Sequence, residues 1–208
     1  MADLPPFIAD PVRPEFAKSP LSGAYEHGEF GAIGGTGPGV VLLERFGIAI
    51  AEVASWRGSE AKIRNAIRQA CGLSLKTAPG SGTIKGEKSA FNIAPRRWLV
   101  SGGEPALAAA LDTAVAGHGT VTDLGHGRTV IRIDGEKSRW VLAKIFAVDL
   151  ADEALARGNG LATAHHDISA RIQRVGPNAF DVYVFRSFAR SFWHLLCRSS
   201  EEVGYRVE

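Results

Sequence analysis

From residue 40 onward, apolar side chains recur in four segments at the three- and four-residue spacing of an amphipathic helix. In the first segment, Ile63, Ile67 and Cys71 share one face, and Gly72 follows as a C-terminal stop signal. The four predicted helices cover residues 59–71, 104–116, 136–146 and 187–203.

Short apolar runs lie between these helices, and turn residues bound them, as is typical of β-strands. The predicted strands cover residues 40–45, 47–54, 90–94, 98–101, 120–123, 129–134, 168–175 and 180–185. Residues 74–88, which are rich in Gly, Ser, Thr and Lys, are predicted to be a loop. The segment around Gly158-Asn159-Gly160 is predicted to be a second loop.

The order of elements, ββαββα, occurs twice with a period of roughly 80 residues. Residues 93–100 and 175–182 take matching places, since each has a proline turn between two strands. Strands followed by a helix that must cover them predict an α+β fold. We therefore predict a single domain over residues 40–208, built from half-domains at 40–117 and 120–203. A chance likeness between two α+β segments is the alternative.

Residues 1–39 lack this periodicity and hold six of the ten prolines of the chain. Proline fixes φ and removes a hydrogen-bond donor, so we predict an extended Pro- and Gly-rich arm. Apolar anchors such as Phe7, Phe16 and Leu21 nevertheless recur along it. Solvated tails usually lack such anchors, so we expect the arm to lie on another surface. A free tail is the alternative.

Composition and charge exclude several classes of protein. Apolar residues make up 45% and charged residues 22% of the 208 residues, which is ordinary globular usage. Twenty-four Lys and Arg against 22 Asp and Glu give a net charge of +2, which provides no reason to expect nucleic acid or a membrane surface as a partner. The chain start shows no signal peptide, and no apolar stretch reaches membrane-helix length, so we expect a cytoplasmic protein.

The motifs that carry catalytic or cofactor chemistry are missing. The Gly-rich run at 34–39 precedes a strand, whereas a phosphate-binding loop follows a strand and opens a helix. His165 and His166 would point to opposite faces of a strand and so would not share a metal ion. Cys71 and Cys197 lie on apolar helix faces without a His at catalytic spacing. We expect no catalytic, cofactor or metal site on this chain.

The most distinctive stretch is the last predicted helix. Phe188, Phe192 and Leu196 form one apolar face and are expected in the core. Trp193 and Cys197 widen this face beyond the arc that one sheet needs, and a helix apolar over most of its circumference is buried on more than one side. The second side is covered either by another subunit or by loops of the chain itself.

We predict a subunit interface that combines the arm with this helix. On the helix, Arg190 and Trp193 are neighbours three residues apart and are typical interface anchors. On the arm, the candidate interface residues are Phe7, Phe16 and Leu21.

Residues 186–194, Arg-Ser-Phe-Ala-Arg-Ser-Phe-Trp-His, resemble the C-terminal signature of the gamma subunit of heterotetrameric sarcosine oxidase. Residues 19–23, 39–45 and 95–99 resemble further parts of the same family in the same order. The match covers most of residues 19–200, and the C-terminal signature is its most specific part.

This resemblance implies a non-catalytic subunit with a duplicated fold like the folate-binding domain of aminomethyltransferase-type proteins. Its partners would be the alpha, beta and delta subunits. The complex of this family oxidises sarcosine to glycine, yields formaldehyde or methylene-tetrahydrofolate, and makes hydrogen peroxide. FAD, FMN, NAD, zinc and tetrahydrofolate are expected on the partner subunits.

Two other functions remain open. One is the equivalent subunit of another N-methyl amino acid dehydrogenase. The other is a stand-alone protein that binds a folate-like molecule in a cleft between the half-domains, framed by residues 74–86 and 156–160. Its basic residues would be Lys85, Lys88, Arg96 and Arg97, which a solvated basic face explains equally well.

Overall fold

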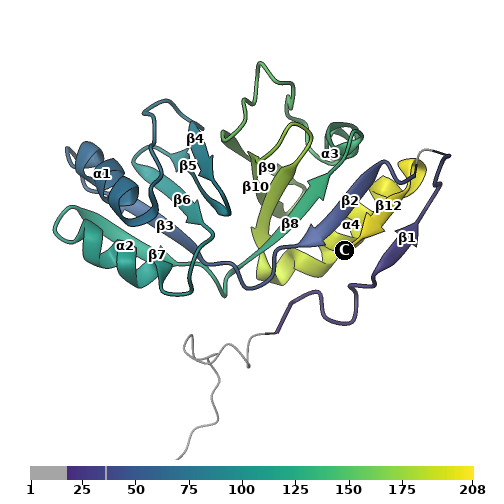
Figure 1. The fold of residues 1–208 in the computed structure, drawn as a ribbon, viewed down its shortest axis with the longest axis horizontal. Helices are drawn as coiled ribbons and strands as arrows, with labels where there is room; N and C mark the ends of the chain where they lie inside the picture. Colours follow the sequence, from purple (N-terminus) through teal and green to yellow (C-terminus); the bar gives the residue numbers. More distant parts are fainter. Residues whose placement is uncertain (1–17, 36) are drawn as a thin grey trace, which may run out of the picture.

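The computed structural model describes residues 18–35 and 37–208, which form two antiparallel-rich sheets with helices on their outer sides (Figure 1). The first sheet has five strands in the order β4-β5-β6-β3-β7. Their bounds are β3 (Ile50–Ser55), β4 (Gly82–Lys85), β5 (Lys88–Ala94), β6 (Arg97–Ser101) and β7 (Gly119–Asp123). The helices α1 (Glu60–Cys71) and α2 (Leu107–Val115) pack on one face of this sheet.

The second sheet has seven strands in the order β1-β12-β2-β8-β11-β10-β9, and only the β12–β2 pair is parallel. Their bounds are β1 (Gly28–Phe30), β2 (Val40–Glu44), β8 (Arg128–Asp134), β9 (Gly160–His165), β10 (Ile168–Arg174), β11 (Phe180–Phe185) and β12 (Tyr205–Val207). The helices α3 (Ser138–Ile145) and α4 (Ala189–Ser200) pack on it, and 3-10 turns at Arg186–Phe188 and Glu201–Val203 flank α4. The predicted α+β class and its four helices are confirmed.

Two segments predicted to be loops contain strands, β4 and β9. The halves therefore have the orders β2-β3-α1-β4-β5-β6-α2 and β7-β8-α3-β9-β10-β11-α4, with one more strand each than the sequence predicted. Both added strands lie at a sheet edge. Edge strands of four and six residues with few fully buried side chains carry a weak apolar signal, because their pairing comes from backbone hydrogen bonds.

The two halves exchange a strand. β2 precedes β3 in the chain but pairs with β8 in the seven-stranded sheet, and β7 precedes β8 but pairs with β3 in the five-stranded sheet. Each predicted half-domain, 40–117 and 120–203, thus contributes one strand to the other's sheet. The division of the chain into an arm and one domain of two repeats stays a prediction.

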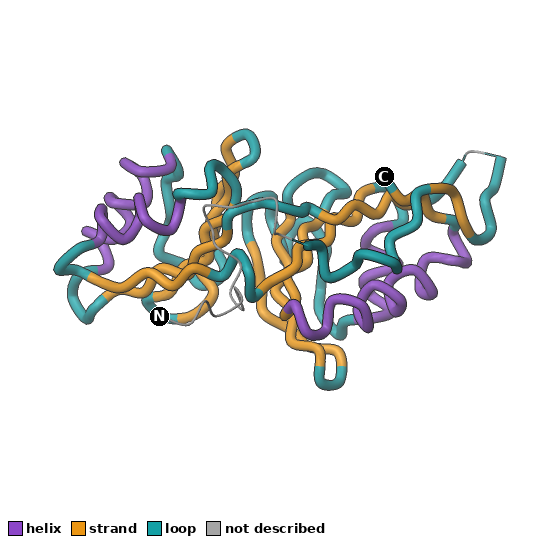
Figure 2. Tube along the Cα trace, turned by 90° about the horizontal axis from the view of Figure 1, so that it is seen from below, coloured by secondary structure: helices purple, strands orange, loops and turns teal. Residues whose placement is uncertain are grey.

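Apolar side chains gather in three clusters. The largest lies between the seven-stranded sheet, α3 and α4, and the second between the five-stranded sheet, α1 and α2. A small third cluster lies between the two sheets and consists of Ile50, Phe91, Leu99, Val130 and Tyr183. The helices of the two halves form separate groups with strands between them (Figure 2), so the sheets meet each other through their inner faces.

The described part of the arm docks on the C-terminal half of the same chain. Leu21 is fully buried in the largest cluster, and β1 forms the edge of the seven-stranded sheet through its pairing with β12. A three-residue strand at an edge agrees with an arm that holds too many prolines for a central strand.

Candidate functional site

A buried polar network joins the two sheets. The hydroxyl of Ser89 donates to Oε1 of Gln173 over 2.8 Å and lies 2.9 Å from the hydroxyl of Ser101. The Ser101 hydroxyl lies 2.8 Å from that of Tyr183. Burial raises the pKa of Tyr183 to about 12, which keeps the phenol neutral. Since two of these residues come from each sheet, the network fixes how the halves face each other.

A buried carboxylate lies next to this network. Asp181 on β11 is fully buried and accepts hydrogen bonds from Arg132 at 2.7 and 2.9 Å and from Arg45 at 2.9 Å. The hydrogen bond to Asp181 raises the pKa of Arg132. A carboxylate without water needs such paired cations, so Asp181 organises both arginines on the inner face of the seven-stranded sheet.

The halves also touch through two glycine-containing loops. Gly160 N–H donates to the carbonyl of Gly80 over 2.8 Å, and Gly82 N–H donates to Oδ1 of Asn159 over 3.1 Å. A Cβ at Gly82 would lie 2.2 Å from the Gly158 carbonyl oxygen, which no side chain permits. Glycine is therefore required at this crossing.

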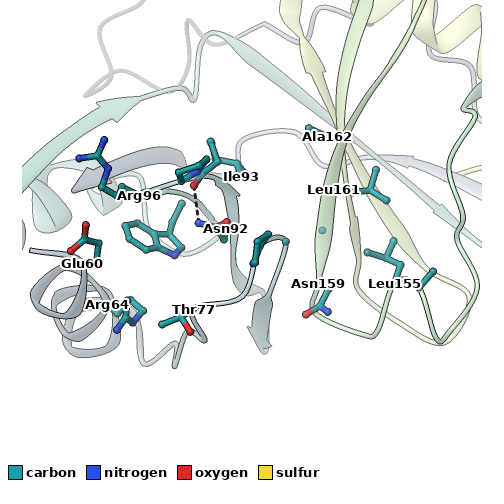
Figure 3. A pocket seen from close by; sticks show the side chains of 17 residues that line it. Glu60, Arg64, Thr77, Asn92, Ile93, Arg96, Leu155, Asn159, Leu161 and Ala162 are labelled. Atoms are coloured by element: carbon teal, nitrogen blue, oxygen red, sulfur yellow. Dashed lines mark hydrogen bonds between the residues drawn. The ribbon is translucent and has the colours of Figure 1, made fainter. Parts of the chain in front are cut away.

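A pocket of about 730 Å³ opens beside this crossing, between the two halves (Figure 3). One wall comes from α1, the loop before β4, and the β5–β6 hairpin, and the other from residues 154–162 around the start of β9. This is the cleft that the sequence framed with residues 74–86 and 156–160, since Thr77, Pro79, Gly80, Asn159 and Gly160 line it.

Of the four basic residues predicted for the cleft, Arg96 is among the residues that line the pocket, whereas Lys85, Lys88 and Arg97 are not. Arg97 forms an ion pair with Glu52 at 3.1 Å. The sequence did not point to Arg64, which lines the pocket from α1. Arg64 is a half-buried polar residue one turn after Glu60, and its sequence position gave no signal, because only the fold brings α1 and residues 77–80 together around the pocket.

The pocket has one carboxylate among its lining residues, Glu60. Hydrogen bonds from its own backbone N–H and that of Gly58 lower the pKa of Glu60, and the charges of Arg96 and Arg64 lower it further. Glu60 is thus held ionised between two guanidinium groups, and the lining side chains carry a net charge of +1.

The predicted interface residues that the structure describes contact each other within the chain. Trp193 is 2% exposed, and its indole N–H donates to the Ala24 carbonyl over 2.9 Å. Arg190 donates to the carbonyls of Pro20 and Ser22 over 2.9 and 2.8 Å. Together with buried Leu21, these contacts attach the arm to α4.

The loops of the chain itself therefore cover the second apolar side of α4. A role of Leu21, Arg190 and Trp193 at a subunit interface stays a prediction. Phe7 and Phe16 lie outside the described residues.

The remaining titratable candidates have structural surroundings. Burial raises the pKa of Cys71, and it raises the pKa of Cys197 to about 11, so neither is an activated thiol. Nδ1 of His165 lies 2.7 Å from the Ile145 carbonyl oxygen. Across residues 18–35 and 37–208, no group of three or more His, Cys, Asp or Glu side chains has the arrangement of a metal site. No helix in this part of the chain has the length and hydrophobicity to cross a membrane.

Solved structures share this architecture. A chain of heterotetrameric sarcosine oxidase from Corynebacterium sp. U-96, solved with pyrrole 2-carboxylate, aligns with a TM-score of 0.74 and 24% identity over 88% of this chain and 94% of that chain. Aminomethyltransferase T of the glycine cleavage system from Bartonella henselae aligns with a TM-score of 0.59 and 16% identity over 90% of this chain and 56% of that chain. The predicted likeness to the aminomethyltransferase fold is confirmed.

Sequence comparison gives the family. No curated protein matches the chain. The model of the sarcosine oxidase gamma subunit family matches residues 57–202, which include both guanidinium groups of the pocket and the whole of α4. This stretch exceeds half of the chain, and the chain therefore belongs to the sarcosine oxidase gamma subunit family.

Proposed function

We propose that this chain acts as the non-catalytic gamma subunit of a heterotetrameric sarcosine oxidase and supports assembly and stability of the complex. The family match over residues 57–202 carries the proposal. The partners are the alpha, beta and delta subunits, which hold FAD, FMN, NAD, zinc and tetrahydrofolate. The complex oxidises sarcosine to glycine, yields formaldehyde or methylene-tetrahydrofolate, and makes hydrogen peroxide in the cytoplasm.

Exposed tryptophans support an assembly role. Trp56, between β3 and α1, is 55% exposed, and Trp140 on α3 is 41% exposed. Tryptophan is enriched among the residues that anchor protein interfaces, because it buries a large area with few rotatable bonds. We infer that Trp56 and Trp140 contact partner subunits, in contrast to Trp193, which is already buried within the chain.

The test is co-expression of the alpha, beta and delta subunits with this chain or with one of its variants. We expect Trp56→Ala and Trp140→Ala to leave the melting temperature of the chain nearly unchanged and to reduce its recovery with the tagged alpha subunit. Trp193→Ala should differ from both, since it should lower the melting temperature by opening the contact between α4 and the arm. The proposal fails if the other three subunits assemble and oxidise sarcosine equally well without this chain.

The same complex distinguishes the related function. If the chain is the equivalent subunit of another N-methyl amino acid dehydrogenase, the assembled complex will oxidise a different N-methyl amino acid faster than sarcosine. Comparing initial rates on sarcosine and on other N-methyl amino acids decides between the two substrates.

A further inference from the structure

The polar side chains of the pocket between the halves are mostly hydrogen-bond donors. Arg64 and Arg96 supply two guanidinium groups, and no carboxylate lies within salt-bridge distance of either among residues 18–35 and 37–208. Asn159 uses its Oδ1 to accept from Gly82 N–H, which leaves its amide N–H groups as donors. A ligand for this pocket therefore needs acceptors, and the net charge of +1 favours an anion.

Trp98 supplies a further donor that the protein leaves unpaired. Its side chain lines the pocket, is 3% exposed, and has an indole N–H without an acceptor in the described part of the chain. A buried N–H without a partner is unfavourable, so buried indoles usually have one. By contrast, the indole N–H of Trp193 donates to Ala24. Because this nitrogen of Trp98 is covered by neighbouring protein atoms, a ligand acceptor becomes its partner only when a neighbouring side chain shifts.

Arg96 occupies a backbone position that favours glycine. It is the second residue of the two-residue turn between β5 and β6, and its φ is +61°. This region is strained for a side chain, and turns with a positive φ at this place commonly have Gly or Asn. Strained positions of this kind cluster at binding sites. Arg96 is among the residues that line the pocket, although glycine would make the same turn without strain.

Thr77 and Asn92 also line the pocket, and the amide N–H groups of Asn92 donate to the carbonyls of Ala94 and Arg97; the other lining side chains are apolar. Ile93, Pro79 and Pro95 line the wall of the first half, and Leu155 and Leu161 line the wall of the second half (Figure 3). A volume of about 730 Å³ lies within the range of roughly 300–1,000 Å³ that is usual for small-molecule sites.

We propose that this pocket binds a small apolar carboxylic acid, with the carboxylate held by Arg64 and Arg96 and the apolar body between the two halves. A carboxylate suits a guanidinium group because that group presents parallel N–H donors. A single negative charge balances the net charge that remains after Glu60 is counted. This ligand site is independent of the assembly role proposed above and needs no partner subunit.

The probes are 2-naphthoate, its neutral amide and acetate, titrated into the full-length chain at pH 7 by calorimetry and by thermal melting. We expect saturable binding of 2-naphthoate with a rise in melting temperature. We expect the amide to bind about tenfold more weakly, as the loss of a charge-assisted contact predicts. Acetate should bind weakly or not at all, because it lacks the apolar body.

Arg96→Gly is the sharpest variant, since glycine adopts a φ of +61° freely and the fold should be as stable as before or more stable. We expect Arg96→Gly and Arg64→Gln each to weaken 2-naphthoate binding about tenfold. Arg68→Gln, one turn further along α1 and not among the residues that line the pocket, is the matched control and should bind as the wild type does. Trp98→Phe should weaken binding while it retains most of the buried ring.

The inference is overturned if 2-naphthoate shows no saturable binding, if acid and amide bind equally, or if Arg96→Gly and Arg64→Gln bind as tightly as Arg68→Gln does. None of these results bears on the assembly role, which is read from co-purification with the alpha subunit. Conversely, loss of assembly in Trp56→Ala would leave binding of 2-naphthoate to the isolated chain unchanged.

Discussion

Two arginines on one strand, Arg128 and Arg132 of β8, have opposite electrostatic surroundings. Arg132 binds the fully buried carboxylate of Asp181 through two hydrogen bonds, which raise its pKa. Arg128 lies four residues away on the same face of the strand. Burial lowers the pKa of Arg128, and the charge of Arg171 lowers it further. Arg128 stacks 3.6 Å above the ring of Phe185.

The space between the two sheets therefore has two ends. We call the end at Asp181 and Tyr183 the closed end and the end at Arg128 and Arg171 the charged end. At the closed end, Asp181 pairs with Arg132 and Arg45, Glu87 pairs with Arg45 as well, and hydrogen bonds link Ser89, Ser101, Gln173 and Tyr183. At the charged end, Arg128 and Arg171 have no carboxylate within salt-bridge distance among the described residues. The structure therefore fixes the mutual position of the halves at the closed end, and substitutions at the two ends should have unequal effects.

Asp181→Ala should have the largest effect. It removes the buried carboxylate that pairs with Arg132 and Arg45 and leaves Arg45 with Glu87 alone, and breaking a buried ion pair typically costs about 3–5 kcal/mol. Urea unfolding at pH 7 measures the loss. Asp112→Ala, on the exposed side of α2, is the control and should change the free energy of unfolding by less than about 0.5 kcal/mol. A loss below about 1 kcal/mol for Asp181→Ala would show that the ion pairs of Asp181 contribute little to the stability of the closed end.

Tyr183 should make stability fall at alkaline pH. Its pKa rises from 10.0 to about 12 in the folded chain, so its contribution is complete below pH 10 and is lost as the pH rises through 12. At about 1.4 kcal/mol per pKa unit, the loss is about 3 kcal/mol.

The measurement is the free energy of unfolding between pH 9 and pH 12 for the wild type and for Tyr183→Phe, which does not titrate at this position. Over this interval, the free energy of unfolding of the wild type should fall by more than that of Tyr183→Phe. Parallel curves would show that the phenol is not buried in the way the structure describes.

Ser89→Ala should have an intermediate effect. It removes the donor to Gln173 and a partner of Ser101, and an unsatisfied buried acceptor costs about 1–3 kcal/mol. Thermal melting of Ser89→Ala beside Ser169→Ala, an exposed serine on β10, gives the comparison. Equal melting temperatures for the two variants would mean that the network contributes nothing to the closed end.

Arg128→Ala and Arg171→Ala should have the smallest effects. Burial already disfavours the charged form of both side chains, so their removal relieves that cost and offsets the lost packing. We expect each to change the free energy of unfolding by less than about 1 kcal/mol. Arg132→Ala, on the same strand, should cost clearly more, because it leaves the buried carboxylate of Asp181 with fewer hydrogen-bond donors. A larger cost at Arg128 than at Arg132 would reverse the comparison.

The sequence predicted the helices and the central strands well, because their apolar faces must follow the periods of 3.6 and 2 residues. It missed β4 and β9, whose short segments lie at sheet edges, and it placed both in loops. It also framed the pocket correctly with the two loops that lie on either side of it. Arg64 escaped notice, since a polar residue on an amphipathic helix shows no sign of the loop that packs beside it.

Trp193 shows most clearly what the hydrophobic pattern of the sequence could not predict. The breadth of the apolar surface on α4 showed that two sides of this helix are buried, but periodicity identifies a buried face and not the group that covers it. Only the tertiary structure shows the arm on that side, with Trp193 donating to Ala24 and Arg190 donating to Pro20 and Ser22.

The sequence by itself thus determined the α+β class, the helices, and the resemblance to the family. The tertiary structure decided which strand joins which sheet, so that β2 and β7 cross to the opposite halves, and which charges are neutralised. The physical reason is that local periodicity follows from the geometry of one chain segment. Strand exchange, the pairing of Asp181 with Arg132 and the pocket at Arg64 and Arg96 instead depend on segments that are far apart in the chain.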